Sequence, residues 1–172
     1  INITSSGYSF KNLEIENVIF NSVISDDTAK VTLNWDNLIK PRYEGNVNLL
    51  VVFDINNISQ KNRVNIITEP SSFYYNDEVW NLMESKLALE EKYFHVENLG
   101  FANKTQNFIV TGTVSETPTD ILNFKFSELD ISTLNVFTKK HKIELEGIMS
   151  GEAALSDLLN KPLFLSDLAI ND

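Results

Sequence analysis

Apolar and polar residues alternate along most of this chain with a period of two. The clearest example spans 29–36, where the alternate positions carry Ala29, Val31, Leu33 and Trp35. Strict alternation over several residues predicts a half-buried β-strand. The same pattern predicts strands at 13–24, 47–55, 64–68, 85–90, 94–99, 107–115, 121–126, 142–155 and 163–170.

One segment departs from this period. Ser127 followed by Asp130 matches a helix start signal, and Ile131, Leu134 and Phe137 then follow at roughly helical spacing. We therefore predict a short helix over 127–139. The stretch 78–84 fits a short helix or a strand equally well.

The segments between the predicted strands are short and rich in Asn, Asp and Ser, which favour turns. Long alternating strands joined in this way predict an antiparallel or meandering sheet with one apolar face. That face needs a cover, and the predicted elements include no long amphipathic helix, so the sheet must curl on itself. We predict a mostly β fold, with a long curled sheet forming an open trough and one or two short helices.

The alternation also predicts which side chains line the apolar face of this trough. They are the large apolar residues at alternate strand positions. The set comprises Leu33, Trp35, Leu49, Val51, Phe53, Leu87, Leu89, Phe108, Val110, Leu122, Phe124, Phe126, Ile143 and Leu145.

Composition and charge narrow the function classes. The chain has 14 Lys and Arg against 24 Asp and Glu, a formal net charge of −10. A surface this acidic repels phosphate, so we expect no nucleic-acid partner. Cysteine is absent, which excludes disulfides, thiolate metal sites and cysteine catalysis. With 42% hydrophobic residues the chain can fold around a core.

The sequence offers little catalytic chemistry. His95 and His141 are far apart, and neither has a second His at i+3 or i+4, as a zinc site would need. The stretch 147–151 reads G-x-x-S-G, which differs from the G-x-S-x-G of a nucleophile elbow. We therefore predict no catalytic residue, no cofactor or metal site, and a function other than catalysis.

The last part of the chain carries a more specific pattern. A short predicted helix bearing Leu129 and Leu134 precedes L-x-G-x-x-S-G, formed by Leu145, Gly147, Ser150 and Gly151. Asn160, Lys161 and Pro162 then precede a strand ending in Leu168 and Ile170. This pattern resembles the repeating unit of the TamB and AsmA-like family of Gram-negative envelope proteins. Ser156 and Asp157 depart from it, because the family often has Gly there.

The resemblance is strongest over 126–172 and looser at 29–36 and 108–115. It gives Gly147, Ser150, Gly151 and Pro162 the roles of bend and turn residues. Glycine in a strand allows a bend or a bulge, and proline is tolerated at the first position of a strand.

The resemblance implies a non-enzymatic protein of the periplasm, anchored in the inner membrane by a helix outside this chain. Residues 1–172 would be one β-rich segment of that longer protein. Its apolar trough would hold phospholipid acyl chains on their way to the outer membrane. A TamA-like or BamA-like outer-membrane barrel would be its partner in assembling autotransporters and other barrel proteins.

A second hypothesis comes from the Trp and Tyr residues. A surface adhesin or carbohydrate-binding β-sandwich would present Trp35, Trp80, Tyr74 and Tyr75 as a stacking platform. The two hypotheses differ in where these rings point. A trough turns its aromatic side chains to the inner face of the strands, whereas a sugar platform exposes them on loops.

Overall fold

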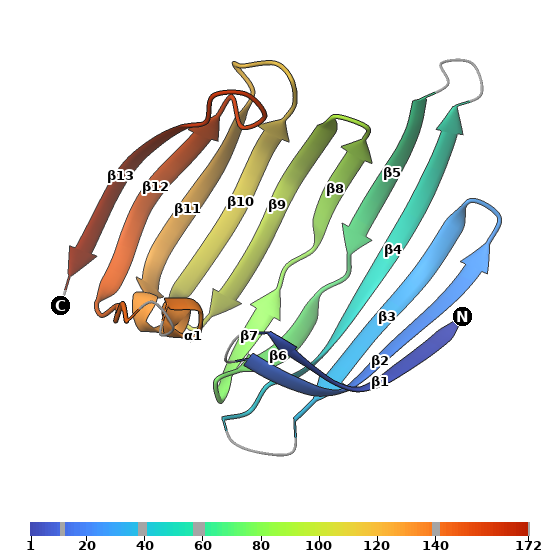
Figure 1. The fold of residues 1–172 in the computed structure, drawn as a ribbon, viewed down its shortest axis with the longest axis horizontal. Helices are drawn as coiled ribbons and strands as arrows, with labels where there is room; N and C mark the ends of the chain where they lie inside the picture. The colour runs from blue at the N-terminus through green and yellow to red at the C-terminus, as the bar shows by residue number, and fades with distance from the viewer. Residues whose placement is uncertain (11–12, 38–40, 57–60, 139–141, 172) are drawn as a thin grey trace.

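The computed structural model describes residues 1–10, 13–37, 41–56, 61–138 and 142–171. They form one large antiparallel sheet (Figure 1), with 72% strand and 4% helix, which confirms the predicted β class. The strands are β1 (Asn2–Phe10), β2 (Leu13–Ser25), β3 (Thr28–Asp36), β4 (Glu44–Asn56), β5 (Lys61–Thr68), β6 (Ser71–Tyr75), β7 (Glu78–Leu82), β8 (Ser85–Glu90), β9 (Tyr93–Asn103), β10 (Gln106–Val114), β11 (Ile121–Asp130), β12 (Ile148–Ser156) and β13 (Leu163–Asn171). Two short helical elements, η1 (Ile131–Leu134) and α1 (Asn135–Thr138), connect β11 to β12.

The sheet is a meander in which neighbouring strands follow one another in sequence, except that β5 lies beside β8. The strands β5 and β6 both pair with β4, while β7 and β8 both pair with β9. The pairing of β5 with β8 and the pairing of β6 with β7 share one register. Val64 pairs with Leu89 in the first, and Tyr75 pairs with Glu78 in the second. Four strands thus form one long hairpin that is interrupted near Pro70, a residue without the N–H that a strand ladder needs.

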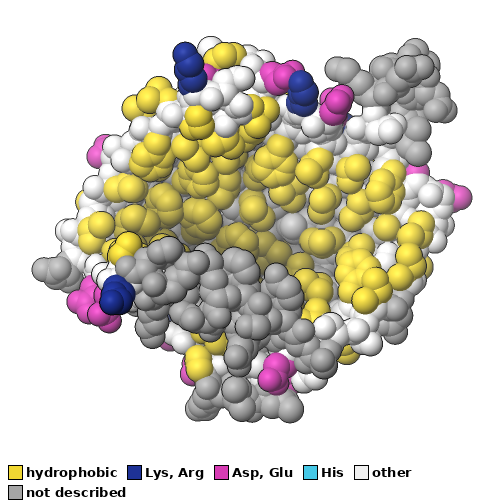
Figure 2. Space-filling view, viewed as in Figure 1, with side chains coloured by type: hydrophobic (Ala, Val, Ile, Leu, Met, Phe, Trp, Pro, Cys, Tyr) yellow, Lys and Arg dark blue, Asp and Glu magenta, His cyan; other side chains and the backbone are white. Residues whose placement is uncertain are grey.

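Directly paired residues lie on the same face of a sheet, so the register identifies two faces. One row of pairs joins Val51, Ile66, Leu87 and Val96 across four strands. A second row continues it across β10, β11 and β12 through Val110, Phe124 and Ala153. We call this side the apolar face; hydrophobic side chains gather over much of the part of it that Figure 2 shows in colour. The opposite side is the polar face.

The helical segment starts later than the sequence predicts. Residues Ser127 and Glu128 belong to β11, where Glu128 adopts a φ of 48° and the pairing with β12 shifts between Phe126 and Leu129. The prediction of a helix start at Ser127 is therefore wrong. The carboxylate of Asp130 caps the helical segment by accepting a hydrogen bond from the Ser132 N–H. Lys139 and the side chain of Phe137 lie outside the described part of the chain.

The strand predicted over 142–155 begins only at Ile148. Before it, the backbone of Leu145 bonds to one side chain in place of a neighbouring strand. The Asn135 amide donates to the Leu145 carbonyl at 2.9 Å and accepts from its N–H at 2.8 Å. This corrects the prediction that Ile143 and Leu145 are strand residues.

Three further elements refine the prediction. The ambiguous stretch 78–84 contains the strand β7, whereas β1 and β6 are strands that the alternation did not reveal.

In the described part of the chain, no helix has the length and apolar character needed to cross a membrane.

Candidate functional site

The apolar face deepens into a cavity over β9 to β13. Its volume is about 790 Å³, which lies within the range of small-molecule sites, roughly 300–1,000 Å³. The side chains around it are apolar or aromatic, apart from Thr133. They are Phe73, Tyr75, Trp80, Phe101, Phe108, Phe124, Phe126, Leu129, Thr133, Leu134, Met149, Ala153, Leu155, Phe164 and Leu168.

A ladder of phenylalanine rings forms part of the cavity wall. The ring of Phe108 on β10 stacks on three neighbours from the adjacent strands. The centroid distances are 6.3 Å to Phe101, 6.4 Å to Phe124 and 5.2 Å to Phe126. Such pairs add about 0.5–1.5 kcal/mol each beyond the burial of their area. The ladder therefore fixes the shape of this wall.

One end of the cavity is closed by a second layer of side chains. Trp80, Leu129, Ile131 and Met149 form the buried core cluster, against which Leu145 also packs. We call this group of five the end cluster. The cluster joins β7, β11, η1 and β12 with the segment that precedes β12, so it closes the end of the sheet next to the helical segment.

A hydrogen bond also ties the β6–β7 hairpin to η1 at this end. The Tyr75 hydroxyl donates to the Thr133 carbonyl at 2.8 Å, across 58 residues of sequence. Burial, followed by the proximity of Tyr43, raises the pKa of Tyr75 to about 12. The hydroxyl is therefore protonated and able to donate at any physiological pH.

The side chains around the cavity differ in their exposure. Phe164 is 57% exposed and Leu168 is 37% exposed, although both side chains line the cavity. Trp80 and Leu129 at the closed end are 7% and 6% exposed. The side chains around the cavity thus range from buried ones on β7 and β11 to exposed ones on β13 and η1, where Leu134 is 37% exposed.

The apolar face continues beyond the cavity towards β3 and β4. Trp35 pairs with Gly45, which in turn pairs with Phe73 on β6. A Cβ at Gly45 would lie 2.5 Å from both the Trp35 ring and the Phe73 Cβ, so the indole occupies the space that glycine leaves. The centroids of the Trp35 and Phe73 rings lie 6.2 Å apart. This contact joins the shallow part of the face to the cavity.

The register places all the predicted apolar residues that lie on strands on this one face. Phe108, Phe124 and Phe126 line the cavity itself. The remaining strand residues of the predicted set extend the face outside it; they are Leu33, Trp35, Leu49, Val51, Phe53, Leu87, Leu89, Val110 and Leu122. Of the two residues outside strands, Ile143 is 52% exposed and Leu145 packs against the end cluster.

The motif residues lie where β11, β12 and β13 meet. Gly151 has a φ of 131°, and a Cβ there would lie 2.1 Å from the Asp167 carbonyl oxygen. Gly147 has a φ of 110° and precedes β12. The Ser150 hydroxyl accepts a hydrogen bond from the Glu128 N–H at the β11 irregularity. Pro162 directly precedes β13.

The four aromatic residues of the adhesin hypothesis do not form one platform. Trp80 is buried in the end cluster, and Tyr75 lines the cavity. Its neighbour Tyr74 points to the other side of β6, where the Arg42 guanidinium carbon lies 3.7 Å from the ring centroid. Both tyrosines belong to a strand, whereas the hypothesis needs them on a loop.

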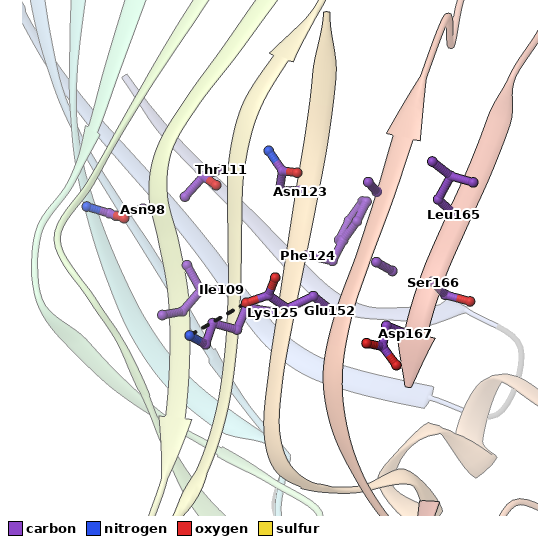
Figure 3. A pocket seen from close by; sticks show the side chains of 12 residues that line it. Asn98, Ile109, Thr111, Asn123, Phe124, Lys125, Glu152, Leu165, Ser166 and Asp167 are labelled. Atoms are coloured by element: carbon purple, nitrogen blue, oxygen red, sulfur yellow. Dashed lines mark ion pairs between the residues drawn. The ribbon is translucent and has the colours of Figure 1, made fainter. Parts of the chain in front are cut away.

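The polar face carries a separate hollow of about 600 Å³ over the same strands (Figure 3). Its side chains include Asn98, Thr111, Asn123 and the ion pair between Lys125 and Glu152, whose closest N and O atoms are 3.7 Å apart. Among the described residues, no group of three His, Asp or Glu side chains could hold a metal ion. His141, one of the two histidines of the chain, lies outside the described residues.

Sequence reasoning missed the residues that give the cavity its depth. Phe101 lies beyond the predicted end of its strand, since β9 continues to Asn103 past the shift in its pairing with β10 near Asn98. Tyr75 lies in a segment for which we predicted no strand, and Trp80 lies in the ambiguous stretch 78–84. Phe101 follows Leu99 by two positions, so extending the alternation by one step would have found it.

Comparison with known proteins adds no further assignment. No protein-family model, no curated protein and no solved structure matches this chain.

Proposed function

We propose that this chain is a trough segment of a TamB-like envelope protein, and that its apolar face holds the acyl chains of phospholipids. The observation that carries the proposal is the continuous apolar face with its deep cavity (Figure 2). Large exposed apolar surfaces in soluble domains mark sites that bind an apolar partner.

The energetics favour an acyl chain on this face. Each methylene group moved from water to an apolar environment gains about 0.8 kcal/mol. The phosphate headgroup remains in water, because burying an unpaired charge costs several kcal/mol. The net charge of −10 also disfavours binding through an anionic headgroup, so the tails must supply the affinity.

The cellular context of the proposal rests on the sequence resemblance. The protein would be periplasmic and anchored in the inner membrane through a part outside this chain. It would pass phospholipid towards the outer membrane and support the assembly of barrel proteins or autotransporters there, with a TamA-like or BamA-like barrel as partner. No step of this function needs a catalytic residue or a cofactor.

A matched pair of substitutions on β11 tests the proposal. Phe124→Arg places a charge on the apolar face, and Asn123→Arg places the same charge one residue away on the exposed polar face. The assay measures fluorescent phospholipid that the chain extracts from vesicles and carries through gel filtration. We expect at least a tenfold loss for Phe124→Arg and wild-type extraction for Asn123→Arg.

The thermal midpoint and elution volume of both variants control for unfolding. A folded Phe124→Arg protein that extracts as much lipid as the wild type would remove the proposal. Equal losses in two folded variants would also contradict it, because the effect would then not depend on the apolar face.

A further inference from the structure

The polar face carries another hollow over β3, β4 and β6, on the side of the sheet opposite the apolar face. Its volume is about 390 Å³, which lies within the range of small-molecule sites, roughly 300–1,000 Å³. We call it the amide hollow. The polar side chains that line it are Asn34, Asp36, Glu44, Asn46, Ser72 and Tyr74.

Asparagine side chains form a hydrogen-bonded row in this hollow. Asn48 donates to the side-chain oxygen of Asn46 at 2.8 Å, and Asn46 donates to that of Asn34. The Thr32 hydroxyl donates to the Asn48 oxygen at 2.9 Å and so begins the row. Each amide NH₂ group carries two hydrogens, of which the row uses at most one, so the amides keep donors for a ligand. Asparagine is depleted in strands, so three of them on neighbouring positions of β3 and β4 indicate a role beyond strand formation.

Tyr74 adds an aromatic ring to the amide hollow. The Arg42 guanidinium carbon lies 3.7 Å from the centroid of this ring, and the same guanidinium bonds to the Glu44 carboxylate. The ring and the carboxylate are thus held in place without a ligand, which lowers the ordering cost of binding.

We propose that the amide hollow binds a neutral oligosaccharide. Sugar hydroxyls both donate and accept hydrogen bonds, so they match the amide donors of Asn34 and Asn46 and the acceptor oxygens of Asp36. The C–H groups of a sugar ring pack on the apolar surface of Tyr74. The site lies on the face opposite the proposed acyl-chain site, so either proposal can fail without the other.

The charges around the hollow select a neutral ligand over an anionic one. Asp36 and Glu44 both line it, whereas among the described residues no Lys or Arg side chain does. The nearby Arg42 is already paired with Glu44. A phosphate or carboxylate group bound here would therefore meet negative charge without a free cation.

The position of the hollow selects a saccharide over an extended peptide. A peptide strand that joins a sheet adds to an edge, where backbone N–H and C=O groups are unpaired. At the hollow, β4 pairs with β3 on one side and with β6 on the other. Only side-chain amides, hydroxyls, carboxylates and a ring remain for a ligand, and a molecule rich in hydroxyl groups matches that set.

Calorimetric titration with maltohexaose, cellohexaose and chitohexaose tests the proposal. The three probes are neutral and differ in their linkages and substituents. We expect at least one of them to bind, and we expect binding to shift the side-chain amide NMR signals of Asn34 and Asn46. Hexagalacturonate, which carries a carboxylate on every ring, should bind at least tenfold more weakly.

Matched substitutions connect the binding to the hollow. Asn34→Asp keeps the oxygen that accepts from Asn46 but replaces the amide donors with a carboxylate oxygen, so it should weaken binding about fivefold. Asn46→Ala removes the middle of the row and should weaken binding by at least as much. Asn123→Ala removes an exposed Asn from the polar face of β11 and should leave binding unchanged. Thermal midpoints confirm that the variants are folded.

Each outcome supports or overturns the proposal. Absence of binding by all three neutral probes overturns it. Unchanged affinity in the folded Asn34→Asp or Asn46→Ala protein also overturns it, because the sugar would then bind elsewhere. Tighter binding of hexagalacturonate would remove the choice of a neutral ligand. A decapeptide of Gly and Ser that binds as tightly as the sugars would assign the hollow to a peptide instead.

Discussion

Two regions of the sheet share the same alternation and differ in depth. In the shallow region, formed by β1 to β4, the apolar-face residues Leu33, Leu49 and Val51 are only half-buried. In the covered region, formed by β6, β7, β9 to β13, η1 and α1, the same face leads into the end cluster. Alternation therefore decides which face is apolar. The buried end cluster lies in the covered region, whereas Ala29 is the buried apolar residue of this face on β3.

Polar side chains interact with one another on the polar faces of both regions. In the shallow region, amide side chains bond across β3 and β4: the Thr32 hydroxyl donates to Asn48 at 2.9 Å, and Asn48 donates to Asn46 at 2.8 Å. In the covered region, the Ser72 hydroxyl donates to Asn81 at 2.7 Å across β6 and β7, and Lys125 forms an exposed charged pair with Glu152. Exposed charge pairs contribute little stability, so the stability of the covered region must come from its apolar side.

The largest expected effect separates the two regions by one substitution in each. Leu129→Ala in the end cluster should lower the free energy of unfolding by about 2–5 kcal/mol, because it leaves a cavity in a buried cluster. Leu33→Ala, on the half-buried face of β3, should cost markedly less. Urea unfolding of both variants measures the difference. Equal losses would mean that the two regions are packed equally well.

The next effect tests the backbone of the covered region. Gly151→Ala should destabilise by about 1–3 kcal/mol, because Gly151 has a φ of 131° and its added Cβ would meet the Asp167 carbonyl. Gly100→Ala is the control in the same region, since its Cβ would meet only the flexible Met83 side chain. Thermal and urea unfolding compare the two. A larger loss for Gly100→Ala would contradict the assigned strain.

A smaller effect concerns the hydrogen bond that ties the hairpin to η1. Tyr75→Phe removes it and should cost about 0.5–1.5 kcal/mol at neutral pH. The folded pKa of Tyr75, about 12, lies above its ordinary value near 10. The stabilisation is therefore fully present below pH 10 and is lost as the pH rises from 10 to 12.

Urea unfolding across this pH range checks the sign. The wild type should lose stability on the alkaline side, and Tyr75→Phe should lose less of it. Tyr74→Phe, on the other face of β6, is the control and should follow the wild type. A wild-type alkaline loss that persists fully in Tyr75→Phe would assign the titration to another group.

The smallest effect defines the limit of the covered region. Glu144 is exposed, although the next residue, Leu145, packs against the end cluster. Glu144→Lys should change the free energy of unfolding by less than about 0.5 kcal/mol. Lipid extraction should also stay at the wild-type level. A clear loss of either would show that the segment before β12 contributes more than its contact with the cluster.

Local alternation was sufficient to predict the mostly β class and most of the strands. The strand β8 (Ser85–Glu90) has the predicted bounds, and β3 differs from its prediction by one residue. The reason is physical: side chains point to opposite faces at successive strand positions, so the pattern of a few residues already assigns the face. Short connections between long strands then favour a meander.

The depth of the face was decided by the tertiary structure. The positive φ values at Asn98 and Glu128 accompany shifts in pairing that depend on the neighbouring strands. Trp80 becomes a core residue only because η1 and β12, about fifty residues or more further along the chain, pack against it. The side-chain amide of Asn135 bonds to the backbone of Leu145, which has no neighbouring strand to pair with there. Contacts between distant segments determine these features, and a period of two carries information only about neighbours in sequence.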